Sequence, residues 1–200
     1  GCTNCYAMKL AGTRLKHHPS RAGLTKPSRS GPVWTGDVRF NKQWLDQPLR
    51  WRKPRLIFVA AHGDLFHENV PDEWLDKGFA VMALAPQHQF QVLTKRPERM
   101  REYLWNGTCA AHIEDAANRL KGRVDYRISW PLPNVWLGVS VEDQQRANER
   151  IPHLLATPAA KRFVSAEPLL GPVDLTHINH RGAASPYHKD ALYGFQTNHG

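Results

Sequence analysis

From residue 55 onward, short apolar runs alternate with longer segments of helical spacing, and this alternation limits the fold more than any other feature of the chain. The predicted strands are residues 55–61, 90–94, 134–141 and 162–165. The predicted helices are residues 70–86, 97–105, 110–120 and 142–156, the last with a break at Pro152. Alternating strands and helices predict a parallel sheet covered by helices, which is an open α/β sheet or part of a barrel.

Each predicted strand ends next to residues that could bind or position a polar ligand. These residues are Asp64, Lys95, Ser140, Glu142 and Glu167. Each one has a structural explanation as well, since Asp64 could cap a turn and Glu142 could open a helix. Because parallel β-α units place ligand groups at the carboxyl ends of their strands, the coincidence of all of them at one edge predicts a binding site there.

Outside the alternating region the chain has little periodicity. Residues 1–55 contain a cysteine pair and then a stretch rich in Pro, Gly, Ser and basic residues, which predicts long loops with short helical pieces. Residues 56–178 hold the repeated β-α units and complete one domain over residues 1–178. Residues 179–200 are expected to form an irregular insertion or tail.

Composition narrows the class of protein. The 200 residues are 41% hydrophobic, which is enough for one globular core, and no apolar run is long enough to span a bilayer. We therefore expect a cytoplasmic protein with no membrane partner. The net charge of +9 favours polyanionic partners. Cys109 stands alone, and we expect it to be a buried structural residue.

The motif Cys2-Thr3-Asn4-Cys5 is the sharpest local feature. Two residues between cysteines let both thiolates bind one zinc ion or iron–sulfur cluster, or act as a redox dithiol. Redox exchange is disfavoured because no strand precedes the pair. A zinc site could recruit His17 and His18, although adjacent histidines differ from the usual ligand spacing. Because the chain starts at Gly1, directly before this motif, we expect it to be an internal fragment.

Five blocks together carry a family resemblance. They are residues 1–7 (GCTNCYA), 64–66 (DLF), 93–97 (LTKRP), 134–141 (NVWLGVSV) and 165–172 (SAEPLLGP). In this order they resemble the phage gene-product thirty-seven/sixty-eight family, radical S-adenosylmethionine (SAM)-like proteins of undetermined reaction. The resemblance implies an α/β fold, a partial (β/α) barrel of the radical-SAM type truncated at both ends. It also implies three cluster cysteines, of which Cys2 and Cys5 match the last two and the first lies before Gly1.

The resemblance implies a cofactor chemistry. Three thiolates hold a [4Fe–4S] cluster that binds SAM, and an electron from a donor protein cleaves SAM to a 5′-deoxyadenosyl radical that acts on an unknown substrate. The implied SAM-binding residues are Tyr6, Asp64, Lys95, Ser140, Glu142 and Glu167. The chain departs from the pattern at Asn4, where an aromatic residue is common, and does not reach the later Gly-Gly-Glu-Ser strand. With one cysteine missing, we expect the fragment itself to be inactive.

A nucleic acid, DNA or RNA, is the substrate class that the basic segment suggests. The segment interleaves aromatic and basic residues, namely Lys42, Trp44, Arg50, Trp51, Arg52, Lys53 and Arg55. Stacking on tryptophan and pairing with phosphate would suit a single strand or an extruded base. A basic surface beside core-facing tryptophans would give the same pattern. Two other interpretations stay open, a non-catalytic zinc-stabilised nucleic-acid-binding module and an inactive fragment.

Overall fold

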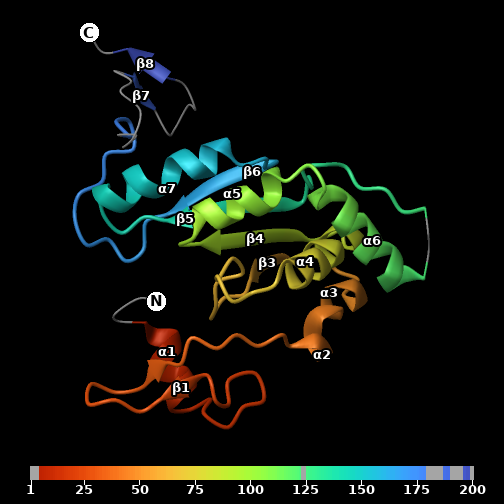
Figure 1. Ribbon diagram of the computed structural model, residues 1–200, viewed down its shortest axis with the longest axis horizontal. Coiled ribbons are helices and arrows are strands. Elements are labelled where there is room, and N and C mark those ends of the chain that lie inside the picture. Colours follow the sequence, from red (N-terminus) through yellow and green to blue (C-terminus); the bar gives the residue numbers. More distant parts are fainter. Residues whose placement is uncertain (1–4, 123–124, 179–186, 190–195, 199–200) are drawn as a thin grey trace.

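Four parallel strands form the centre of the molecule (Figure 1). The computed structural model describes residues 5–122, 125–178, 187–189 and 196–198. The strands are β3 (Leu56–Val59), β4 (Gln89–Thr94), β5 (Val135–Ser140) and β6 (Lys161–Ser165), and they lie in the order β3-β4-β5-β6. All three strand pairs are parallel. The predicted α/β class is therefore confirmed, and each predicted strand is present within one to two residues of its expected bounds.

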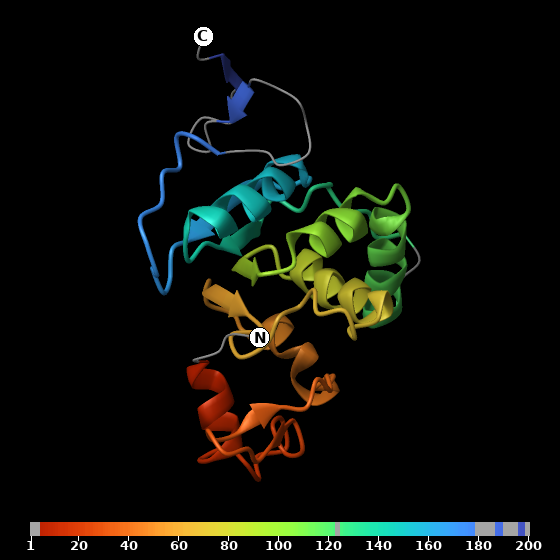
Figure 2. The same cartoon turned by 60° about the vertical axis from the view of Figure 1, so that its left-hand side comes forward.

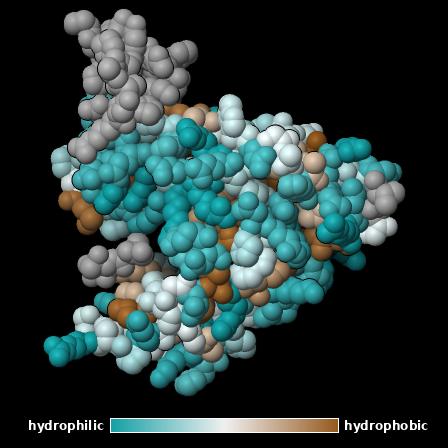
Figure 3. Space-filling view, in the orientation of Figure 1, coloured by the Kyte–Doolittle hydropathy of each residue, from teal (hydrophilic) through white to brown (hydrophobic). Residues whose placement is uncertain are grey.

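Helices follow each of the first three strands. They are α4 (Asp72–Leu84), α5 (Pro97–Trp105), α6 (Cys109–Lys121) and α7 (Gln144–Ala156). Figures 1 and 2 show that α4, α5 and α7 lie on one face of the sheet, and α6 packs against α4. Figure 3 shows that the outer side of this helical layer is mostly hydrophilic. The predicted break at Pro152 is wrong, because α7 continues through this residue while Ile151 and Leu154 beside it are buried in the core.

The two faces of the sheet differ in burial. On β4 the residues Phe90, Val92 and Thr94 are buried, whereas the alternating residues between them are only half-buried. Successive side chains of a strand point to opposite faces, so one face of β4 packs under the helices and the other does not. On the edge strand β3, Leu56 and Phe58 are 63% and 45% exposed. The apolar core thus lies between the sheet and its single helical layer.

The buried amide of Asn134 connects the segments that precede β4 and β5. Asn134 donates from its amide nitrogen to the carbonyl oxygens of Met82, Ala85 and His88, at 2.9, 3.2 and 3.2 Å. Those carbonyls lie at or just beyond the end of α4, where a helix leaves acceptors without partners. Asn134 therefore closes that helix end and fixes the loop that enters β4.

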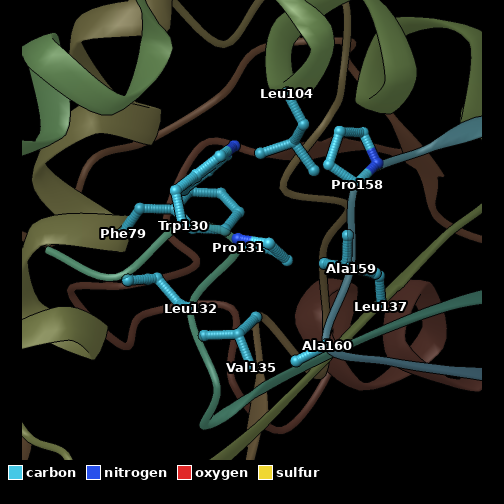
Figure 4. Close-up of a pocket in the computed structure, with 10 residues that line it drawn as sticks. All are labelled: Phe79, Leu104, Trp130, Pro131, Leu132, Val135, Leu137, Pro158, Ala159 and Ala160. Atoms are coloured by element: carbon cyan, nitrogen blue, oxygen red, sulfur yellow. The ribbon is translucent and has the colours of Figure 1, made fainter.

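An apolar pocket lies at this same end of the sheet. Figure 4 shows its lining residues, which come from α4, α5, the loop before β5, β5 itself and the loop before β6. Phe79, Leu104 and Trp130 line one side, and Pro158 to Ala160 close another. The pocket has no charged lining residue and lies at the opposite end from the loops that follow the strands. We therefore assign it to core packing.

The segment before the sheet forms a separate layer of short elements. These are α1 (Tyr6–Gly12), β1 (Thr25–Lys26), β2 (Val33–Trp34), α2 (Lys42–Leu45) and α3 (Gln47–Arg50). The short helical pieces match the expectation, but the antiparallel β1–β2 pair was not predicted. Near the carboxyl end, β7 (Tyr187–Lys189) pairs antiparallel with β8 (Gln196–Asn198), within the segment that the sequence predicts to be irregular. Over the described residues, no helix is both long enough and apolar enough to cross a membrane.

Cys109 occupies the buried structural position that the sequence predicts, at 2% exposure. Burial, and to a lesser degree the charge of Asp76, raise the pKa of its thiol to about 12. At pH 8 the group therefore stays a thiol, the unreactive form. We expect iodoacetamide to alkylate Cys5 in the native protein while Cys109 reacts only after unfolding in urea, as measured by peptide mass spectrometry. Equal rates at both cysteines in the native protein would contradict this placement.

Candidate functional site

Asp64 joins the loops that follow β3 and β4. Its Oδ1 accepts hydrogen bonds from the Phe66 backbone N–H at 3.0 Å and from Thr94 Oγ1 at 2.7 Å. Its Oδ2 accepts from the Lys95 backbone N–H at 3.1 Å and from the Arg96 guanidinium at 3.2 Å. Four donors occupy both carboxylate oxygens. Asp64 therefore caps its own turn and clamps the two loops together, which fixes the backbone of Lys95.

Glu142 forms the second charged group at this edge. It is buried, at 7% exposure, and its carboxylate lies between the Lys95 ammonium and the Arg150 guanidinium, the latter at 2.9 Å. Arg150 also donates to the Ser140 carbonyl oxygen at 2.8 Å. Burial opposes the charged carboxylate, but the hydrogen bond from Lys95 and the charges of Arg150 and Lys95 outweigh it and lower the pKa of Glu142. The carboxylate is therefore ionised at neutral pH.

Glu167 differs from the other two carboxylates. It is exposed in the loop that follows β6, and no hydrogen bond or ion pair involves its carboxylate among the described residues. The same loop is tied to the end of β5, because the Leu170 backbone N–H donates to the Glu142 carbonyl oxygen at 2.7 Å. Of the three predicted carboxylates at this edge, Glu167 is the one whose oxygens remain available to an incoming ligand.

The start of α1 approaches the loop that follows β3. Cys5 is a free, partly exposed cysteine immediately before α1, whereas Cys2 lies outside the described residues. The exposed ring of Tyr6 meets the ring of His62 edge-on, with centroids 5.7 Å apart. Because His62 belongs to the loop between β3 and Asp64, this contact places the start of α1 beside the carboxyl ends of the strands.

Arg21 orients His62. The Arg21 guanidinium donates to His62 Nδ1 at 3.1 Å, and since arginine can only donate, Nδ1 is the acceptor and Nε2 carries the proton. Burial and the charge of Arg21 lower the pKa of His62, which favours this neutral form. A neutral, oriented ring beside Tyr6 keeps the contact between the two layers fixed.

The basic segment lies mainly at the opposite edge of the sheet. Arg55 directly precedes β3, and Trp51 lies four residues before Arg55. The Arg55 guanidinium lies 4.3 Å from the centroid of the Trp51 ring. Trp51 also contacts the buried His88, which enters β4. Arg52 and Lys53 are exposed beside them, while Arg50 pairs with Asp46 one turn earlier. The structure thus groups Trp51 with three exposed basic residues but separates them from Lys95 and Glu142.

The remaining residues of that segment face the first layer. Trp44 is 39% exposed and its ring stacks on His18 with centroids 5.7 Å apart, and Lys42 is exposed nearby in α2. His18 Nδ1 also hydrogen-bonds Ser20 Oγ at 2.7 Å. His18 therefore has a packing role. Within the part of the chain that the structure describes, no group of three or more histidines, cysteines and carboxylates is arranged to bind a metal.

Four residues of this region were not singled out by sequence reasoning. Arg150 lies inside a predicted helix, Thr94 is the last residue of a predicted strand, and Arg21 and His62 lie in loops. Each acts through a partner at least eight positions away in the sequence. The one local signal is the spacing of Glu142 and Arg150, eight residues apart across the start of α7.

The chain was compared with known proteins. A family model described as "Protein of unknown function (DUF5131)" matches residues 1–184. No curated protein and no solved structure matches the chain.

Replacement of Asp64 by Asn tests the clamp. The new amide NH₂ group would face the Lys95 N–H and the Arg96 guanidinium, which are donors themselves. We expect Asp64→Asn to lower the free energy of unfolding by about 1–3 kcal/mol, the cost of leaving such donors without an acceptor. Urea denaturation measures this, with the exposed Asp37→Asn as the control. Equal stabilities for the two variants would show that the four hydrogen bonds contribute nothing.

Glu142→Gln tests the buried ion pairs and should act in a pH-dependent way. At pH 7 the variant removes the negative charge that pairs with Lys95 and Arg150, and we expect a loss of about 3 kcal/mol in unfolding free energy. Because the folded-state pKa of Glu142 is lowered, its contribution is present above the unfolded pKa and disappears as the pH falls through the folded value. The difference from the wild type should therefore shrink in acid.

The matched control for this experiment is the exposed Glu102→Gln in α5. It changes the same charge without affecting a buried pair, so its unfolding free energy should follow the wild type at every pH. A deficit in Glu142→Gln that stayed constant from neutral to acid pH would contradict the assignment of the effect to the ionised carboxylate.

Proposed function

Because this chain belongs to the DUF5131 family of proteins of unknown function, we propose its function from its own residues. The proposal is a SAM-binding iron–sulfur protein of the radical-SAM type, part of an enzyme related to the phage gene-product thirty-seven/sixty-eight family. The sheet would then be part of a (β/α) barrel. The observation that supports the proposal is the contact between Tyr6 and His62, because Cys5 directly precedes Tyr6 and His62 follows β3 at the edge that carries Lys95, Glu142 and Glu167.

The chemistry of the donor set fits the proposed cofactors. Thiolates are the ligands that iron–sulfur clusters take, and Cys5 is free and partly exposed beside this edge. In the proposal Cys2 and Cys5 hold the [4Fe–4S] cluster together with a cysteine before Gly1. A bound cluster supplies the electron for reductive cleavage of the SAM sulfonium, and a separate donor protein restores that electron.

The residues of the edge divide into binding and positioning groups. The Glu167 carboxylate can accept hydrogen bonds from the ammonium or the ribose hydroxyls of SAM, and the Lys95 ammonium can pair with its carboxylate. Tyr6 offers an exposed ring beside them. Asp64 and Glu142 hold Lys95 in place, and the Ser140 carbonyl oxygen accepts a hydrogen bond from Arg150. In the proposal these three residues therefore act on SAM only through their neighbours.

The proposal also specifies a compartment. Free thiols and a labile cluster need a reducing environment, and the cytoplasm supplies one. The free thiols of the partly exposed Cys5 and the buried Cys109 agree with this location.

Metal and sulfide analysis tests the proposal. The protein is extended upstream of Gly1 to include the expected first cysteine and is purified without oxygen. We expect about four irons and about four acid-labile sulfides per chain. The Cys2→Ala/Cys5→Ala variant should lose both, whereas the matched control Cys109→Ala should keep them because that thiol is buried away from the edge. SAM should then bind the loaded protein and bind Glu167→Gln more weakly.

Other outcomes of the same analysis would overturn the proposal. About one zinc per chain without sulfide would favour the zinc-stabilised binding module. Neither metal in a folded protein would favour the inactive fragment. Iron that persists in the Cys2→Ala/Cys5→Ala variant would show that the motif is not the cluster ligand.

A further inference from the structure

The face of the sheet opposite the helices, which we term the open face, carries a row of side chains in register across all four strands. The register pairs Phe58 with Gln91, Gln91 with Trp136, and Trp136 with Lys161. Residues paired in register across parallel strands share one face. The row therefore presents an aromatic ring, an amide, a second aromatic ring and an ammonium group along a line across the sheet.

A second row on this face adds another aromatic ring. Leu93, Gly138 and Phe163 are in register across β4, β5 and β6. A Cβ atom at Gly138 would lie 2.5 Å from the Phe163 ring, so the absence of a side chain there lets the ring lie across β5. Glycine at this position therefore gives the open face a flat aromatic surface instead of a bulky aliphatic one.

The open face is not part of the core, and it is partly exposed. The aromatic residues of the two rows are absent from the apolar core cluster; they are Phe58, Trp136 and Phe163. Their neighbours Ile57 and Val164, which point to the other face, contact that cluster. Phe58 is 45% exposed. The exposed Lys161 holds its ammonium 4.7 Å from the centroid of the Trp136 ring, which places a cation on the outer side of that indole.

Positive charge also gathers at the amino edge of the sheet. Arg55 precedes β3 at one side of the sheet, and Lys161 begins β6 at the other. Because the register sets Lys161 level with Phe58, Arg55 and Lys161 are about 14 Å apart across the strands and about 10 Å apart along them. The exposed Arg52 and Lys53 extend the charge beyond Arg55. Two aromatic–cation pairs, Arg55 with Trp51 and Lys161 with Trp136, thus stand at the two ends of the same edge.

We propose that the open face binds single-stranded nucleic acid, with bases stacked on Phe58 and Phe163 and phosphates paired with Lys161 and the basic residues at the amino edge. Stacking on aromatic rings beside a positively charged groove is how proteins hold single strands without sequence preference. The amide of Gln91 lies between the rings, where it can exchange hydrogen bonds with base edges.

The polar members of the row distinguish this occupant from an apolar one. A helix or strand with an apolar face would cover Gln91 and Lys161 without supplying hydrogen bonds or a counter-charge, and burial of such groups without partners is unfavourable. A nucleic acid supplies both, since its bases carry donors and acceptors and its phosphates carry negative charge. The chain as a whole, with a net charge of +9, is complementary to that partner.

The inference goes beyond the proposed cofactor function, and the two are tested separately. Phe58, Gln91 and Lys161 lie on the sheet itself, whereas Cys5 directly precedes α1. A Cys2→Ala/Cys5→Ala variant should therefore bind a single strand as the wild type does. Loss of the cluster and loss of strand binding can be observed separately in the same preparations.

Fluorescence anisotropy with a labelled oligothymidylate of about 16 nucleotides tests the inference. We expect the 200-residue chain to bind it with an affinity that falls between about 50 and about 200 mM salt. Phe58→Ala should weaken binding about 5- to 150-fold, the effect of one lost stacking contact. Lys161→Ala should lower the slope of log K against log salt by about 0.7, the value for one phosphate contact on a single strand.

The matched control is Arg101→Ala/Trp105→Ala, which removes an exposed cation and a 68% exposed aromatic ring from α5 in the helical layer. Circular dichroism confirms that each variant is folded. Binding that is absent, independent of salt, or equally weakened by the control and by Phe58→Ala/Lys161→Ala would overturn the inference. A change of oligomeric state in Phe58→Ala without a change of strand affinity would show that the face joins two copies of the chain instead.

Discussion

The parallel register of β3 to β6 is the constraint from which the other features follow. Consecutive strands that run in one direction need a return connection between them, and here the helices of these connections lie on a single face. Every loop that follows a strand therefore falls at one edge, and every loop that precedes a strand falls at the other. With six residues in β4, the two edges are about 20 Å apart. This separation divides the charged cluster around Glu142 from the basic residues around Arg55.

At the carboxyl edge, charge is neutralised within the protein before any ligand arrives. A buried carboxylate such as Glu142 is tolerated only when opposite charges and hydrogen bonds surround it, and Lys95 and Arg150 supply them. Asp64 is satisfied in the same way by backbone and side-chain donors. The loops at this edge are thus held in place by hydrogen bonds and ion pairs within the protein. Glu167 differs from Asp64 and Glu142, because its carboxylate is exposed and has no protein partner among the described residues.

Sequence patterns predicted the elements whose signal is local. The apolar spacing of α4 and the apolar run of β5 are properties of neighbouring residues, and both elements lie where expected. The two-residue strands β1 and β2 carry no such pattern, and α7 passes through Pro152 because burial of its neighbours outweighs a lost hydrogen bond. The pairings of Asp64 and Glu142 depend on how strand ends meet in space. A sequence can identify these residues as candidates but cannot say that their oxygens are already occupied.

The strand β4 indicates why one face of a parallel sheet can stay without a helical cover. Strands buried on both faces read as continuous apolar runs, and strands with one wet face alternate. The sequence of β4, Gln89-Phe90-Gln91-Val92-Leu93-Thr94, alternates through its first four residues although it is a central strand. The Gln89 amide donates to the Asn134 carbonyl oxygen at 2.6 Å, but a helix packed on that side would have to bury the Gln91 amide without supplying a partner. The Gln91 amide, the aromatic rings beside it and the ammonium of Lys161 instead match a ligand that is flat, polar at its edges and negatively charged.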